Sequence, residues 1–242
     1  MDNYSIENIR KQIIGNDVLI ETPYGKRHML YLDYTASGRG IKIIENKLNE
    51  ILNFYANTHT EDDYSGKYLT TILNKAEKRI KNIVNADVNG KIVLTGSGAT
   101  GALKKLQEII GVYIPPSTRE RINNSIINNA KLGTNFLKNI EKTRPVVFIG
   151  PYEHHTNEIM WRESLAEVVV IKLNKDGKID LFDLEKKISD KKYDNRNKLA
   201  SFSAGSNVTG IITDVYQIAE ICHRYDTLIF FDFAAVAPYE EI

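Results

Sequence analysis

Three groups of residues in this chain have side chains and spacing suited to handling a ligand. The first is the glycine-rich turn Thr95–Thr100, in which Gly96 and Gly98 alternate with residues that carry hydroxyls. Glycines let the backbone approach an anion closely, and a helix that begins there presents unpaired N–H groups and the positive end of its dipole. The turn is not a P-loop, because no Gly-Lys-Ser/Thr follows. A phosphate cradle and an ordinary tight strand-to-helix turn are equally good interpretations.

The second group is the run Glu153–Asn157, which contains His154 and His155 and follows a predicted strand. A metal site is its weakest interpretation, because adjacent histidines in a loop do not readily face one ion. Two others stay open. The residues are either polar loop residues without a function, or they supply a flat imidazole that lies over an aromatic ligand and exchanges protons with it.

The third group is Asp232, which ends the apolar run 228–231. A carboxylate in apolar surroundings is costly unless a cation pairs with it, and a protonated pyridine nitrogen is such a cation. The alternative is that Asp232 caps a helix formed by the residues that follow it.

Strands and helices alternate along the part of the chain that must position these groups. The apolar runs predict strands over residues 18–22, 29–32, 92–94, 146–149, 168–173, 199–203 and 228–231. The helical periodicity predicts helices over residues 6–14, 41–55, 68–84, 101–110, 181–188 and 215–225, with a weak helix or surface excursion within 115–144. This alternation predicts an α/β fold of three layers, in which helices cover both faces of a mainly parallel mixed sheet. The carboxyl ends of such strands are where ligands bind.

The bulk composition excludes several classes of partner. Lys and Arg total 32 against 31 Asp and Glu, so a net charge of +1 favours neither nucleic acid nor an anionic membrane surface. No run approaches the ~20 apolar residues of a membrane span, and the N-terminus lacks a signal-peptide pattern, so we expect a cytoplasmic protein. The single cysteine, Cys222, excludes an internal disulfide and a multi-cysteine zinc site, and it is predicted to be a small buried hydrophobe.

Taken in order, these groups resemble the class V aminotransferase and cysteine desulfurase family of pyridoxal-phosphate enzymes, which have fold type I. The resemblance runs from Tyr31 to Pro238. The matching motifs are Leu32–Ser37, Ser97–Thr100, Glu153-His154, Ser206–Gly210 and Asp232. Its implied fold is an aspartate-aminotransferase-like large domain over residues 28–242, incomplete at its C-terminus and preceded by an N-terminal segment, residues 1–27.

The resemblance also implies roles for individual residues around pyridoxal 5'-phosphate. His154 would stack on the cofactor ring, Asp232 would pair with the pyridine nitrogen, and Asn207 would reach the ring oxygen or the substrate. The phosphate would be held by four consecutive residues, Ser97, Gly98, Ala99 and Thr100. Loops on the substrate side would include Ala36, Ser37 and His59. No metal is implied.

The chain departs from the family at three places. Ala235 stands where cysteine desulfurases carry a Gln that binds the ring hydroxyl, which places desulfurase activity in doubt, and Gly101 stands where they carry Glu. The Schiff-base lysine, expected some twenty or more residues after Asp232, has no counterpart before Ile242. Lys104 and Lys105 are predicted to face solvent rather than to replace it. We therefore expect an inactive N-terminal fragment of a longer enzyme.

For the full-length protein the resemblance implies an enzyme that acts on an amino-acid substrate, either an aminotransferase or a cysteine desulfurase or lyase, and that forms a homodimer. The alternative is a non-catalytic or degenerate α/β domain that binds a phosphate-bearing ligand or a partner protein. Ala235 and the absent lysine favour the alternative, whereas Thr100, His154 and Asp232 oppose it.

Overall fold

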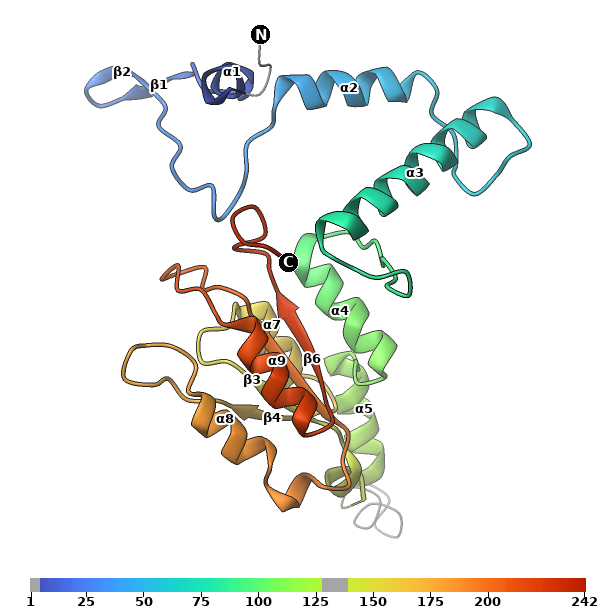
Figure 1. Ribbon diagram of the computed structural model, residues 1–242, viewed down its shortest axis with the longest axis vertical. Coiled ribbons are helices and arrows are strands. Elements are labelled where there is room, and N and C mark those ends of the chain that lie inside the picture. Colours follow the sequence, from blue (N-terminus) through green and yellow to red (C-terminus); the bar gives the residue numbers. More distant parts are fainter. Residues whose placement is uncertain (1–4, 128–138) are drawn as a thin grey trace. The chain divides into compact units, whose positions relative to one another are not determined.

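The computed structural model describes residues 5–127 and 139–242 (Figure 1). The chain divides into two compact units. The first unit comprises residues 1–92 with 241–242, and the second comprises residues 93–240. The predicted N-terminal segment, residues 1–27, lies within the first unit.

The first unit consists of helices and one antiparallel hairpin. Its elements are α1 (Ile6–Gln12), β1 (Leu19–Thr22), β2 (Gly25–His28), α2 (Lys42–Leu52) and α3 (Tyr64–Ile83). The predicted helices and the strand β1 are confirmed, but β2 was not predicted, because its residues carry no apolar alternation and it forms only by pairing with β1. The predicted strand over residues 29–32 is wrong. Leu30 and Leu32 are 83% and 86% exposed, and no described strand pairs with them.

The second unit contains a four-stranded sheet with its helices. Its helices are α4 (Gly98–Ile110), α5 (Pro116–Ile127), α7 (His155–Arg162), α8 (Leu181–Ile188), the short 3-10 helix η1 (Lys191–Tyr193) and α9 (Val215–Arg224). Its strands are β3 (Val146–Ile149), β4 (Glu167–Val170), β5 (Lys198–Ser203) and β6 (Thr227–Asp232). The strand order is β4-β3-β5-β6, and every pair in this sheet is parallel.

The core consists of two apolar clusters, and alternate residues of β3 belong to one or the other. Val146 and Phe148 pack with residues of α8 and α9, whereas Val147 and Ile149 pack with residues of α4 and α7. Because side chains alternate between the two faces of a strand, one wholly apolar strand serves both clusters. The predicted α/β fold, a parallel sheet with helices on both faces, is confirmed (Figure 1). Cys222 is buried in the α8 and α9 cluster, as predicted, and burial raises the pKa of its thiol to about 12.

Two further predictions about the second unit are wrong. Residues 92–94 form no strand: Val93 and Leu94 are 54% and 62% exposed, and no described strand pairs with them. The sequence predicts a loop at residues 153–157, but His155 begins the helix α7, which is short and opens with polar residues. The described helices include none that is long and apolar enough to cross a membrane.

Candidate active site

The glycine-rich turn leads directly into α4 and leaves its first N–H groups open. Ser97 and Gly98 both have left-handed backbone angles, with φ of 66° and 62°. Ser97 makes no side-chain cap to the helix, so the first N–H groups of α4 have no partner from that hydroxyl. A Cβ placed on Gly98 would meet nothing within 4 Å, which leaves open space beside the turn. The turn therefore has the geometry of an anion site.

The turn is also tight on its inner side. A Cβ placed on Gly101 would lie 1.8 Å from the carbonyl oxygen of Gly96, so only glycine fits there. Gly96, Gly98 and Gly101 also have the Gly-x-Gly-x-x-Gly spacing of dinucleotide sites. That motif requires a strand immediately before the turn, and residues 91–95 form none.

His154 is the N-cap of α7. Its Nδ1 accepts the backbone N–H of Thr156 at 3.2 Å and lies 3.1 Å from the Thr156 hydroxyl. Since Nδ1 is an acceptor, the proton of the neutral imidazole is on Nε2. These contacts hold the His154 ring through Nδ1. Because the ring is exposed, Nε2 is free to contact a ligand.

Thr156 joins this histidine to the glycine-rich turn. Its hydroxyl lies 3.1 Å from that of Thr100, at hydrogen-bonding distance. The structure thus connects two groups that are far apart in the sequence, Thr100 on α4 and His154 before α7. Thr156 was not among the predicted site residues. No local signal in the sequence identifies it, because its contact with Thr100 depends on α4 and α7 lying side by side.

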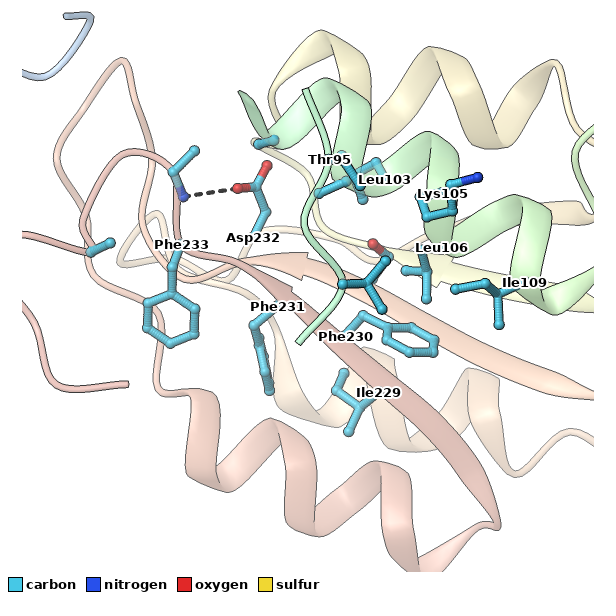
Figure 2. A pocket seen from close by; sticks show the side chains of 16 residues that line it. Thr95, Leu103, Lys105, Leu106, Ile109, Ile229, Phe230, Phe231, Asp232 and Phe233 are labelled. Atoms are coloured by element: carbon cyan, nitrogen blue, oxygen red, sulfur yellow. Dashed lines mark hydrogen bonds between the residues drawn. The ribbon is translucent and has the colours of Figure 1, made fainter. Parts of the chain in front are cut away.

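Asp232 lies at the carboxyl end of β6, beside a pocket of about 660 Å³ between β6 and α4 (Figure 2). Phe230 and Asp232 extend toward α4, and Phe231 extends to the opposite face of the sheet. Ala99 lines the same pocket as Asp232, so the phosphate turn and the carboxylate share one cavity. Thr95 and Ser201, which were not predicted as site residues, add hydroxyls to its wall.

The Asp232 carboxylate has a local partner but no cation. Its Oδ1 accepts the backbone N–H of Ala234 at 2.9 Å, which closes a turn. Residues 233–242 contain no helix, so the alternative that Asp232 caps a following helix is wrong. No Lys, Arg or His among the described residues forms an ion pair with it. This half-buried carboxylate has a free oxygen for a positively charged ligand group.

No contact among the described residues joins the other predicted residues to this group. Asn207 is exposed in the loop after β5 and lines none of the pockets described here. Ala36, Ser37 and His59 are exposed residues of the first unit. They stay predictions.

The two lysines of α4 are engaged at the surface. Lys104 and Lys105 both pair with Glu108 one turn along the helix, and each side chain is about half exposed. Lys105 also lines the pocket, although its ammonium group is bound to the Glu108 carboxylate (Figure 2). Within residues 5–127 and 139–242, no group of three or more His, Cys, Asp or Glu could hold a metal ion.

Comparisons with known proteins agree with this fold. A solved apo structure of a cysteine desulfurase from Thermococcus onnurineus NA1 is similar with a TM-score of 0.63 and 22% identity, over 94% of this chain and 47% of that chain. At this identity the similarity establishes the fold.

Two curated relatives, each named a probable cysteine desulfurase, extend the match in sequence. The one from Halalkalibacterium halodurans is 28% identical over 88% of this chain and 46% of its own length. The one from Borreliella burgdorferi is 23% identical over 93% of this chain and 47% of its own length. The chain thus spans about half the length of the curated relatives it matches.

The sequence also matches the family described as Aminotransferase class-V over residues 30–114 and 124–242. The unmatched gap, residues 115–123, falls mostly within α5 and outside the segments that carry Thr100, His154 and Asp232. The match covers most of the chain and includes all three. The chain therefore belongs to the class V aminotransferase family.

Proposed function

We propose that this chain is the cofactor-binding part of a pyridoxal-phosphate enzyme that acts on an amino acid. The observation that carries the proposal is the joining of three groups at one edge of the sheet. Thr156 links His154 to Thr100, and Asp232 shares a pocket with Ala99 of the same turn. An anion grip, an exposed imidazole and an unpaired carboxylate are the groups that a phosphorylated, protonated pyridine requires.

The chain's own residues fit this cofactor. The open N–H groups at the start of α4 and the Thr100 hydroxyl would hold the phosphate. Asp232 would hold the proton on the pyridine nitrogen, because its free oxygen has no cation among the described residues. His154, fixed through Nδ1, would cover the ring and place its Nε2 proton near the reacting atoms. When bound, the cofactor supplies an electron sink for the bond that breaks at the substrate.

The substrate proposal rests on the relatives. Both curated relatives quoted above are named probable cysteine desulfurases, so cysteine is the first amino acid to test. Ala235 cannot supply the ring contact that a Gln would make there. The chain spans about half the length of these relatives, and we propose that the Schiff-base lysine lies in the part of their length that it does not cover. From the resemblance alone we propose a cytoplasmic homodimer.

The proposed site is tested by the binding of pyridoxine 5'-phosphate. This compound has the ring and the phosphate but no aldehyde, so it measures the grip of the site without any reaction with a lysine. We expect the 242-residue chain to bind it, and Thr100→Val to weaken binding about tenfold, since about 1.4 kcal/mol is a modest loss for a hydrogen bond to a charged group. Isothermal titration calorimetry measures both affinities.

The matched control is Thr118→Val, which removes an exposed hydroxyl on α5 that lines neither pocket beside the turn. Its affinity should equal that of the unaltered chain. If the unaltered chain fails to bind pyridoxine 5'-phosphate, or if Thr100→Val and Thr118→Val bind equally well, the proposed phosphate grip is wrong.

A further inference from the structure

The carboxylate of Glu153, the residue before His154, has no role in the function proposed above. Glu153 stands between the end of β3 and the start of α7. Its Oε1 accepts the backbone N–H of Gly150 at 3.1 Å. Its Oε2 accepts the Asn157 side-chain amide at 2.6 Å and the Ser203 hydroxyl at 2.7 Å. No Lys, Arg or His among the described residues forms an ion pair with it, so neutral donors alone hold this carboxylate.

The direction of these hydrogen bonds is fixed by a buried tryptophan. The indole Nε1–H of Trp161 donates to Oδ1 of Asn157 at 3.1 Å, and the Ser201 hydroxyl donates to the same oxygen at 2.6 Å. An indole can only donate, so the Asn157 amide cannot flip. Its NH₂ group must then face Glu153, and the atom that receives it must be an acceptor. Trp161 and Asn157 are both fully buried, so water does not substitute for either partner.

Two features show that this part of the chain is shaped around a carboxylate. A Cβ on Gly150 would lie 2.2 Å from Oε1 of Glu153, so Gly150 leaves the space that the oxygen fills. Burial raises the pKa of Glu153, and the donors from Ser203, Asn157 and Gly150 act in the opposite direction. Because donors occupy both oxygens, the hydrogen-bond pattern suits the ionised form.

The carboxylate connects the backbone segments that carry the proposed site. Glu153 immediately precedes His154 in the chain. Ser203 is the last residue of β5 and is paired with Asp232 in the register of β5 and β6. The backbone N–H of Ala204, next in the chain, donates to the carbonyl oxygen of Asp232 at 2.9 Å. One partly buried side chain thus connects the loop of His154 to the strand end beside Asp232.

We propose that Glu153 is a positioning residue of this site, whose carboxylate fixes the backbone of His154 against the end of β5 next to Asp232. This inference rests on the proposed function in one respect, which is that His154 and Asp232 contact the bound ligand. Glu153 itself acts through Gly150, Asn157 and Ser203.

Glu153→Gln tests the proposal with almost no change of shape. The new NH₂ group must face either the Gly150 N–H or the Asn157 NH₂, and neither can accept a hydrogen bond. Asp183→Asn is the matched control. Asp183 is also a partly buried carboxylate, accepts the backbone N–H of Lys172 at 2.9 Å beyond the end of β4, and pairs with Lys187. It makes no contact with the proposed site.

The first readout needs no ligand. Nitrogen-15 spectra of the imidazoles, with His154 assigned through His154→Asn, report whether Nδ1 stays the acceptor. In Glu153→Gln we expect both His154 nitrogens to shift toward the values of an unrestrained imidazole, whereas Asp183→Asn leaves them in place. The second readout is the affinity for pyridoxine 5'-phosphate, which we expect to fall at least tenfold in Glu153→Gln and to stay unchanged in the control.

The outcomes separate this inference from the proposed function. Unchanged His154 signals in a folded Glu153→Gln chain would show that Glu153 is merely structural. If those signals move but the unaltered chain binds no pyridoxine 5'-phosphate, the positioning role stands and the proposed function fails. Should Glu153→Gln not fold, Ser203→Ala keeps the carboxylate and removes one donor. It should move the same signals by a smaller amount, and no movement would overturn the proposal.

Discussion

In the proposed pyridoxal-phosphate enzyme, Asp232→Asn is expected to slow turnover about 100-fold or more, which corresponds to roughly 3 kcal/mol of transition-state stabilisation. The electron sink requires a protonated pyridine nitrogen, and a neighbouring carboxylate favours that protonated form. Asparagine keeps the shape and can still accept the Ala234 N–H, so the turn after β6 stays closed. Only the charge is lost. The measurement is kcat with cysteine, together with the affinity for pyridoxine 5'-phosphate, which should fall less than kcat.

Asp190→Asn is the control for any effect on the hydrogen bond between an aspartate side chain and a nearby backbone N–H. Asp190 also accepts the N–H of the residue two positions on, Lys192, at 3.1 Å, but it lies at the start of η1. Turnover should be unaffected there. Asp232→Glu should keep part of the rate where the longer side chain still reaches the nitrogen. Wild-type turnover in Asp232→Asn would make Asp232 a turn residue without a role in the chemistry.

Much of the second unit was predictable because its strands contain runs of apolar residues. The run over residues 146–149 has no polar residue, which is typical of a strand buried between two helical layers, and the structure places β3 there. The same reasoning predicted Asp232 at a strand end, and β6 ends at that residue. Residues 92–94 are also apolar, but a strand exists only where a neighbour accepts its backbone hydrogen bonds, and periodicity does not contain that information.

The hydrogen bonds that connect the site residues could not be predicted, because they join residues far apart in the sequence. Thr156 meets Thr100 across a sequence separation of 56 residues, and Ser203 meets Glu153 across 50. Such contacts depend on which helices and strands lie side by side, and single residue types do not reveal it. The Glu153-His154 motif drew attention to the histidine, whereas the hydrogen bonds of the partly buried carboxylate beside it depend on Asn157 and Trp161, which only the structure places there.

The sharpest structural prediction concerns Gly101, where two physical effects have opposite signs. Alanine favours a helix over glycine by about 1 kcal/mol, so propensity alone predicts that Gly101→Ala stabilises α4. The new Cβ would lie 1.8 Å from the carbonyl oxygen of Gly96 and 3.0 Å from its carbon, and a backbone carbonyl cannot swing aside as a side chain can. Overpacking typically costs about 1–3 kcal/mol, and a clash with a fixed backbone carbonyl belongs at the upper end of that range, about 3 kcal/mol. Packing should win, and the free energy of unfolding should fall by about 2 kcal/mol, the difference between these two estimates.

Denaturant unfolding followed by the fluorescence of Trp161, the only tryptophan in the chain and fully buried in the same unit, measures this change. Gly96→Ala is the control, because a Cβ there meets nothing within 4 Å, and we expect no loss of stability. Gly101→Ala should also weaken the binding of pyridoxine 5'-phosphate, since the start of α4 must shift to admit the methyl group. A Gly101→Ala chain as stable as the unaltered one would mean that the turn does not bring Gly96 and Gly101 into contact. The replacement of the family's Glu by glycine at this position would then have no structural cause in the turn.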